Sequence, residues 1–356
     1  MKGLIISGGK GSRLRPFTYT GAKQMVPIAN KPILFYVIEH LVAAGIKDLH
    51  IIISPETGDQ IRAETGDGRR FGASINYIVQ PQPGGIAQAI ALGEDAMEGQ
   101  PFVSFLGDNF LTHGIVPFVQ RFAASTDDAC IMLKQVPDAR QFGVARFDGE
   151  RLVQVVEKPD VPPSDLAVIG IYMFTPRVFE AIRSIKPSAR GELEITDTIQ
   201  WLLDHGANVR AEVVDGEWID TGRHDDLLSA NRIVLERLPD DRSGGAIDDL
   251  SQLHGRVVLQ SGSRVVNSVI SGPVIIGERT IIENAYIGPF TSIDRDCHVA
   301  ESEISGSVVL ENTSIRRLSH RIEHSLIGRN VELMGDDRKP RGYQLILGDF
   351  SRVRVP

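Results

Sequence analysis

The stretch that decides the fold lies at the start of the chain and runs Leu4-Ile5-Ile6-Ser7-Gly8-Gly9-Lys10-Gly11-Ser12-Arg13-Leu14-Arg15-Pro16. Its apolar part predicts a buried strand, and its second part is a glycine-rich turn that carries cations. Glycines allow positive φ and let backbone N–H groups approach an anion closely. The planar guanidinium of Arg13 suits phosphate oxygens, and Lys23 follows ten residues later. These features predict that the turn binds a polyphosphate.

The spacing of the glycines excludes two better-known phosphate loops. A P-loop needs Gly-x4-Gly-Lys-Ser/Thr, and neither Lys10 nor Lys23 has glycines at those offsets. The dinucleotide fingerprint Gly-x-Gly-x-x-Gly fails because Leu14 stands where the third glycine is required. An ordinary strand-to-helix turn is the alternative, and it explains some of the glycines but not the accompanying cations.

The composition is that of an ordinary globular protein with an acidic surface. The 356 residues are 42% hydrophobic and 24% charged, and their net charge of −8 argues against a nucleic-acid partner. No stretch approaches the roughly 20 apolar residues of a membrane span, and the apolar run before Gly8 is too short for a signal peptide. Cys130 and Cys297 lie in apolar stretches, as expected of buried thiols in a reducing compartment. We therefore expect a cytoplasmic protein with no nucleic-acid or membrane partner.

Two periodicities divide the chain. Up to about residue 238, strand-like apolar runs alternate with helical stripes, which predicts an α/β fold with a Rossmann-like, mainly parallel sheet flanked by helices. Residues 239–250 form a polar, glycine-bearing linker. Beyond it, aliphatic residues recur every six positions, which predicts a parallel β-helix over 251–356 with these residues pointing inward: Val269, Ile275, Ile281, Ile287, Ile293 and Val299. Because a β-helix has open ends, we also expect a homo-oligomer.

Acidic residues stand at the ends of several expected strands, where ligands bind in open α/β sheets. Asp108 follows the strand 102–106, and Asp220 follows Trp218 and Ile219. Both are candidate Mg²⁺ ligands, since Mg²⁺ takes one or two carboxylates together with water and phosphate oxygens. The alternative is a helix-cap or turn role for Asp108 and a turn role for Asp220.

Three cations are candidate phosphate ligands. Lys23 follows the glycine loop, and Lys158 is held between Glu157 and Pro159; the alternative for both is a solvated surface lysine. Arg190 is either a phosphate donor or a charge at the entry of the next helix. Thr196 and Glu194 are candidate caps for that helix, which is expected over 195–205.

These motifs resemble, in this order, those of the sugar-1-phosphate nucleotidyltransferases: 8–16, 23–27, 80–89, 107–109, 157–159, 191–197 and 218–222. The likeness covers about residues 1–238, so we expect a catalytic domain over this range. The hexads resemble the left-handed β-helix of the longer family members. The resemblance implies a Mg²⁺-dependent enzyme that transfers a thymidylyl group from dTTP to glucose 1-phosphate and releases pyrophosphate.

The resemblance also implies a role for each matching residue. Asp108 and Asp220 would bind Mg²⁺, and Arg13, Lys23 and Asp108 would be the catalytic residues. Gln80 and the main chain of Gly85 would contact the pyrimidine. The implied nucleotide-binding set is Gly8, Gly9, Gly11, Ser12, Arg13, Lys23, Gln24, Gln80 and Gly85. The implied sugar-phosphate set is Asn109, Gly143, Glu157, Lys158, Val168, Tyr172 and Arg190.

Three other functions stay open. A preference for UTP is one, because a single methyl group separates the two pyrimidine nucleotides. A bifunctional enzyme that also transfers acyl groups is another; it needs a histidine on the β-helix, and no partner is evident from the sequence for the candidates His254, His298, His320 and His324. The third is a catalytically silent nucleotide-sugar sensor, which would typically lack the loop cations or metal carboxylates that this chain retains.

Overall fold

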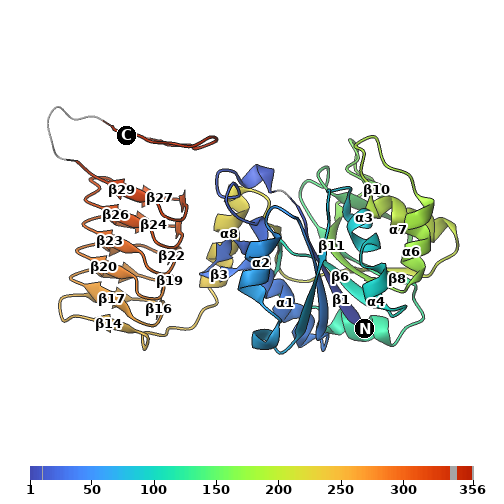
Figure 1. Ribbon diagram of the computed structural model, residues 1–356, viewed down its shortest axis with the longest axis horizontal. Helices are drawn as coiled ribbons and strands as arrows, with labels where there is room; N and C mark the ends of the chain where they lie inside the picture. Colours follow the sequence, from blue (N-terminus) through green and yellow to red (C-terminus); the bar gives the residue numbers. More distant parts are fainter. Residues whose placement is uncertain (10, 337–342, 355–356) are drawn as a thin grey trace. The chain divides into compact units, whose positions relative to one another are not determined.

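The computed structural model describes residues 1–9, 11–336 and 343–354, so Lys10 of the glycine loop lies outside the described residues. The described chain separates into two compact units (Figure 1). The first comprises Met1–Gly11, Thr20–Met25 and Ile33–Asp220, and the second comprises Ser12–Tyr19, Val26–Pro32 and Thr221–Pro356. Two short N-terminal segments therefore belong to the same unit as the C-terminal part of the chain.

Nine strands of the described chain form the sheet of the first unit. Its parallel half has the order β6 (Phe102–Leu106), β1 (Lys2–Ser7), β4 (Asp48–Ile53) and β5 (Ser74–Val79). This half confirms the Rossmann-like expectation. The other half is antiparallel through β11 (Leu166–Phe174), β9 (Gly143–Asp148), β10 (Arg151–Glu157) and β8 (Ala129–Gln135), with β12 (Val209–Val213) parallel to β8.

Helices bury both faces of this sheet (Figure 1). Side chains alternate along β1, so Ile5 belongs to one core and Leu4 to the other. The core around Ile5 includes side chains of α1 (Ile33–Ala43), α2 (Gly58–Thr65) and α5 (Val116–Ala123). The core around Leu4 includes those of α3 (Ile86–Ala91), α4 (Glu94–Met97), α6 (Arg177–Ser184) and α7 (Ile195–Asp204). Burying each such aliphatic side chain stabilises the fold by about 1.5–3 kcal/mol, which explains the continuous apolar strands.

The helix expected over 195–205 is confirmed as α7, which ends one residue earlier. The helical segment 86–97 is not continuous, because the chain breaks at residues 92 and 93 into α3 and α4. The break lies at Gly93, where a Cβ atom would lie 2.9 Å from the side chain of Leu4. Close approach to the sheet therefore requires a glycine here, and glycine weakens a helix.

Residues 245–334 of the second unit form a parallel β-helix (Figure 1). One of its three described sheets contains β14 (Gly245–Ile247), β17 (Ser263–Val266), β20 (Ile281–Glu283), β23 (His298–Ala300), β26 (Ser314–Arg316) and β29 (Glu332–Met334). The second contains β15 (Gln252–His254), β18 (Val269–Ser271), β21 (Tyr286–Ile287), β24 (Glu303–Ser305) and β27 (Ile322–Glu323). The third contains β16 (Val257–Leu259), β19 (Val274–Ile276), β22 (Thr291–Ile293), β25 (Val308–Val309) and β28 (Leu326–Ile327).

The inward-pointing residues of the first coils differ by one position from the expected hexads. The core contains Ile270, Ile276 and Ile282, so the prediction that Val269, Ile275 and Ile281 point into it is wrong. The step from Ile282 to Ile287 is five residues long, which brings the core back into phase with the expected Ile287, Ile293 and Val299. Because the early hexads carry two adjacent aliphatic residues, their sequence leaves the phase undecided.

The second unit also contains the helix α8 (His224–Leu235) and a small hairpin of β2 (Pro27–Ile28) and β3 (Lys31–Pro32). Both lie against the β-helix, where Ala29, Leu235 and Ile275 share a buried apolar cluster.

Candidate active site

The glycine loop and Asp108 come from neighbouring strand ends. In the parallel pair of β1 and β6, Ile6 lies opposite Leu106, and the Gly107 N–H donates to the Ile6 carbonyl at 2.9 Å. A Cβ atom on Gly107 would overlap the Ser7 hydroxyl, so a glycine is needed at this point. The turn that begins at Gly8 and the carboxylate of Asp108 therefore meet at one edge of the sheet, as predicted for a ligand site.

A lysine–carboxylate contact lies at this edge. Lys23 begins the short helix η2 (Lys23–Met25), and its Nζ donates to the Asp108 carboxylate. Asp108 is only 6% exposed, and a Cβ on Gly9 would lie 3.5 Å from Lys23 Cε. Burying an ion pair gives little net stability because both charges lose their hydration, so this contact marks a candidate functional site. The structure thus brings Gly9, Lys23 and Asp108 together.

The second predicted metal ligand is carried on an adjacent strand. β13 (Trp218–Asp220) pairs antiparallel with β7 (Asn109–Leu111), and Asp220 lies opposite Asn109. Within the described residues, no cluster of three or more His, Cys, Asp or Glu side chains forms a complete protein cage for a metal. Two aspartates fit Mg²⁺, which completes its shell with water and phosphate oxygens. The ammonium of Lys23 shows that this position accepts positive charge.

The expected base-binding residues flank the glycine loop. Gln80 follows β5, is buried, and donates through Nε2 to Gln88 Oε1 at 2.6 Å. A Cβ on Gly8 would overlap the Gln80 side chain, so the loop packs directly on this amide. Gly85 has φ +99°, and a Cβ there would overlap the Leu193 carbonyl, so its main chain is held against residues 191–197.

Gln24 presents a buried acceptor beside Lys23. Its side chain is 1% exposed, and its Oε1 has no hydrogen-bond partner among the described residues. Buried polar atoms are normally paired, and an orphan acceptor is typical of a site that receives a donor from a ligand.

A second polar cluster forms at the end of β10. Glu157 lies opposite Gly143 of β9 and accepts hydrogen bonds from Arg190 Nη2 at 3.0 Å and Thr196 Oγ1 at 3.1 Å. Lys158 adds its Nζ at 3.6 Å from the same carboxylate and has a positive φ of 40°. The cluster therefore holds a carboxylate with cations beside it, which suits a phosphorylated, hydroxyl-rich ligand.

The hypothesis that Thr196 or Glu194 caps α7 is wrong. Glu194 occupies the N-cap position but makes no capping bond, and its carboxylate instead accepts from Arg190 Nη2 at 2.8 Å and Ser188 Oγ at 2.7 Å. The Thr196 hydroxyl donates to Glu157. Sequence reasoning missed these supporting roles because an acid and a threonine ahead of a helix also match a capping pattern.

Val168 and Tyr172 lie on β11, the strand between β9 and β6 in the sheet, and Asn109 directly follows Asp108. Asn109 is buried and donates through Nδ2 to the Ile169 carbonyl, and a Cβ on Gly143 would lie 3.6 Å from Val168 Cβ. Burial raises the pKa of the Tyr172 phenol well above its ordinary value, and the charge of Glu157 raises it further. The phenol therefore stays neutral and able to donate.

The remaining loop residues lead into the second unit. Gly11 has φ +62°, and Ser12 and Arg13 are exposed at the start of η1 (Ser12–Leu14). Burial raises the pKa of Asp226 in α8, and the charges of Arg223 and Arg13 partly offset this rise. Arg13 therefore lies near the N-terminal turn of α8.

The two buried thiols are unreactive at neutral pH. Burial raises the pKa of Cys130 and of Cys297 to about 12, so both stay protonated at neutral pH.

None of the helices in the described ranges has the length and apolar character that a bilayer span demands.

The chain belongs to the nucleotidyl transferase family, whose sequence profile matches residues 2–237. It is 46% identical to the glucose-1-phosphate thymidylyltransferase of Streptomyces griseus over 356 residues, which covers 100% of this chain and 99% of the relative. It is 42% identical to the low-salt glycan biosynthesis nucleotidyltransferase Agl11 of Haloferax volcanii over 359 residues, with 100% of both chains covered.

A solved structure extends the comparison to three dimensions. A Bacillus anthracis protein assigned as a glucose-1-phosphate thymidylyltransferase, in complex with sucrose, matches with a TM-score of 0.64 and 38% identity. The match covers 68% of this chain and 98% of that one. The predicted family and the nucleotidyltransferase class of enzyme are therefore confirmed.

Proposed function

We propose that this protein transfers the thymidylyl group of dTTP to glucose 1-phosphate and forms dTDP-glucose and pyrophosphate. The proposal rests above all on the contact of Lys23 with Asp108 beside the glycine loop. This contact supports the proposal because it holds a cation and a candidate metal-binding carboxylate beside the turn that would bind the triphosphate. The names of the Streptomyces griseus and Bacillus anthracis relatives support the choice of substrates.

The reaction needs no nucleophile from the protein. A phosphate oxygen of glucose 1-phosphate, already ionised at neutral pH, forms a bond to the α-phosphorus of dTTP. The bond from that phosphorus to the bridging oxygen breaks in line, and pyrophosphate leaves with its electron pair. Catalysis then comes from positioning and from stabilising charge. Lys23 and Arg13 would supply fixed positive charge that reduces repulsion between the two anionic substrates.

Asp108 and Asp220 would hold Mg²⁺, which when bound neutralises phosphate charge and orients the triphosphate. Asp108 has a second task, because its carboxylate orients the Lys23 ammonium. Gln24, Gln80 and the main chain of Gly85 would contact the base, with Gly8, Gly9, Gly11 and Ser12 forming the phosphate turn.

The sugar phosphate would occupy the cluster around Glu157. The Glu157 carboxylate would accept hydrogen bonds from sugar hydroxyls, and Tyr172, Val168, Gly143 and Asn109 would line the sugar. Lys158 and Arg190 would bind its phosphate. Arg190 is held by the Glu194 and Glu157 carboxylates, so its guanidinium is oriented before the ligand arrives.

The contacts of His298 argue against a role for this histidine in acyl transfer. His298 lies 3.2 Å through Nε2 from Glu283 and accepts at Nδ1 from Arg316 at 3.1 Å. With both ring nitrogens engaged, the imidazole has no free nitrogen to act as a base. For the β-helix we propose an assembly role in a cytoplasmic homo-oligomer. Of the expected linker 239–250 between the domains 1–238 and 251–356, β14 already belongs to the first coil of the β-helix.

Pyrophosphate release tests this proposal. The enzyme is incubated with Mg²⁺, each of the four deoxynucleoside triphosphates or UTP, and a set of sugar 1-phosphates. We expect the largest kcat/KM with dTTP and glucose 1-phosphate, with UTP weaker by roughly 10–200-fold because only one methyl group differs. Equal or better use of UTP would contradict the thymidylyl assignment, and no release with any pair would favour a silent sensor.

A further inference from the structure

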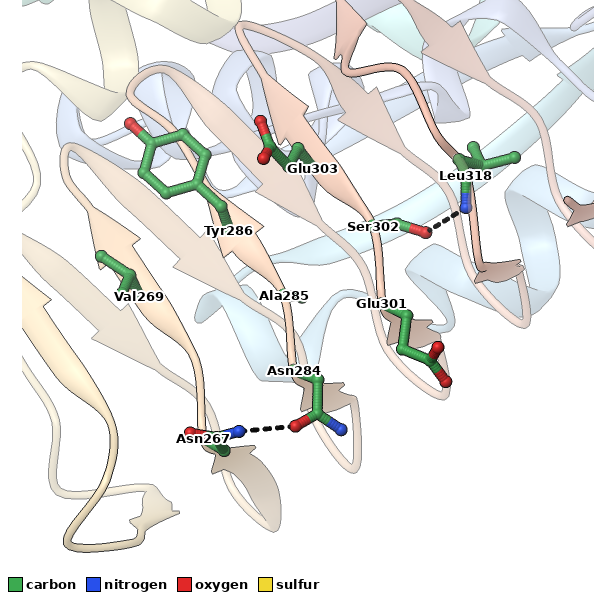
Figure 2. A pocket seen from close by; sticks show the side chains of 9 residues that line it. All are labelled: Asn267, Val269, Asn284, Ala285, Tyr286, Glu301, Ser302, Glu303 and Leu318. Atoms are coloured by element: carbon green, nitrogen blue, oxygen red, sulfur yellow. Dashed lines mark hydrogen bonds between the residues drawn. The ribbon is translucent and has the colours of Figure 1, made fainter.

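A cleft of about 480 Å³ lies on the β-helix, and Figure 2 shows the side chains that line it. Several of its polar groups already have partners. Asn267 donates to Asn284 at 2.7 Å, and Ser302 Oγ accepts from the Leu318 N–H at 3.2 Å. The Arg321 guanidinium covers the Tyr286 ring at 4.9 Å. A ligand would have to break these contacts, so the cleft does not point to a binding site.

A different contact of the β-helix reaches the N-terminal segments. The hairpin of β2 and β3 has its tip at Ala29 and Asn30, both at positive φ. The Ala29 N–H donates to Asn231 Oδ1 of α8 at 2.9 Å. Asn30 Nδ2 donates to the Ile293 carbonyl of β22 at 2.8 Å. The hairpin tip is thus tied both to α8 and to a coil of the β-helix.

Asn231 joins all three elements. It is 1% exposed, and besides Ala29 its Oδ1 accepts from the Ser292 hydroxyl at 2.9 Å. Its Nδ2 donates to the Phe290 carbonyl at 3.3 Å. A buried amide that accepts twice and donates once cannot be replaced by an apolar side chain without leaving backbone groups unpaired.

The anchored hairpin directly follows Lys23. Residues 23–25 form η2, and the hairpin strand β2 begins at Pro27. Little chain length separates the Lys23 ammonium from the anchor, so the anchor limits where the lysine backbone can go. The segment Ser12–Tyr19 belongs to the same unit, where the Phe17 ring packs on His224 of α8 at 5.8 Å.

We propose that Asn231 is a positioning residue for nucleotide binding, through which α8 and the β-helix hold the hairpin that fixes Lys23. This inference rests on the proposed function. It gives the β-helix a task within each chain, distinct from assembly. Disrupting the anchor should weaken the binding of the triphosphate more than that of the sugar phosphate, whose cluster lies on β9, β10 and residues 190–196.

The full-length variant Asn231→Ala tests the proposal against Ser268→Ala as matched control. Ser268 is also buried, and its hydroxyl accepts a backbone N–H, that of Ala285, at 3.0 Å inside the β-helix coils. We expect Asn231→Ala to raise the KM for dTTP roughly 5- to 30-fold, with the KM for glucose 1-phosphate unchanged. Amide hydrogen exchange at Ala29 should accelerate in the same variant. Ser268→Ala should lower the Tm without either effect.

Two results would overturn the proposal. One is faster exchange at Ala29 with an unchanged KM for dTTP, and the other is unchanged exchange. If Asn231→Ala does not fold, Asn30→Gly keeps the positive φ while removing the bond to Ile293, and it should raise the KM for dTTP to a smaller extent; no rise would contradict the proposal. Hydrogen exchange needs no catalysis, so it also separates a failure of this inference from a failure of the proposed function.

Discussion

Asp220 lies directly opposite Asn109 in the antiparallel pair of β13 and β7. Because Asn109 directly follows Asp108 in the chain, the two aspartates lie near each other. The pairing joins two aspartates that are far apart in the sequence. We predict that Asp220→Asn raises the Mg²⁺ concentration needed for half-maximal rate at least about tenfold, because one of two charged ligands is lost. Initial rates over a Mg²⁺ titration measure this. The exposed Asp160→Asn serves as control, and identical Mg²⁺ dependence in both variants would remove Asp220 from the metal site.

Lys23→Ala should lower kcat by about 10²–10³-fold and should also lower the Tm, because removing one member of a buried ion pair leaves the other charge less well compensated. Loss of one preorganised charge at the reacting phosphates has an effect of this size. The buried Asp108 carboxylate would also lose its contact with the Lys23 ammonium. Lys47→Ala, a surface change, is the control, and steady-state rates with circular dichroism check both. A near-normal rate in Lys23→Ala would refute the catalytic assignment.

Gly8→Ala should raise the KM for dTTP and leave the KM for glucose 1-phosphate unchanged. The new methyl group would overlap the Gln80 side chain, a flexible neighbour that can move. The fold should therefore survive while the expected base contact is displaced. Gly114→Ala, at an exposed site without positive φ where nothing lies near the added Cβ, controls for the loss of a glycine. Equal changes in both KM values would show that Gln80 has no selective role.

Glu157→Gln should raise the KM for glucose 1-phosphate by about tenfold or more, since charged hydrogen bonds to the sugar become neutral ones. Arg190 keeps the Glu194 carboxylate and can keep the amide oxygen of the new side chain, while the Thr196 hydroxyl can accept from its amide N–H, so the cluster should stay assembled. Isothermal titration with each substrate separates the two affinities. An unchanged affinity for glucose 1-phosphate, or a selective loss of dTTP binding, would place the sugar elsewhere.

Cys130 and Cys297 should resist thiol reagents in the folded protein. Burial raises both pKa values to about 12, so the reactive thiolate is scarce at neutral and mildly alkaline pH and increases only toward strongly alkaline pH. Titration with a chromogenic disulfide should detect neither thiol until guanidinium unfolds the chain and exposes both. Rapid labelling with loss of activity in the native state would contradict their burial.

The parallel half of the sheet and the position of the phosphate loop could be predicted from the sequence, because both depend on local patterns. The apolar run before Gly8 ends where β1 ends, and the acids at strand ends lie near the loop because parallel strands share an edge. The motif resemblance is carried by short, nearly contiguous segments, so a single chain suffices to detect the family.

Other features depend on contacts between distant residues, which local patterns do not encode. Thr196 and Glu194 match a capping pattern, and only the tertiary approach of β10 shows that they serve Glu157 and Arg190. The phase of the β-helix core depends on a five-residue step after Ile282, which adjacent aliphatic residues conceal. The anchor at Asn231 joins residues more than two hundred positions apart in the chain.

The configuration at phosphorus tests the account most directly. The enzyme is supplied with glucose 1-phosphate and one diastereomer of dTTP carrying sulfur on the α-phosphorus, and the configuration of the sugar nucleotide is determined. Direct attack by the sugar phosphate within the Lys23–Asp108 site predicts a thio-substituted dTDP-glucose with inverted configuration and an equal amount of pyrophosphate. Retained configuration would reveal a covalent enzyme intermediate, and the absence of a sugar nucleotide would reject the transferase itself.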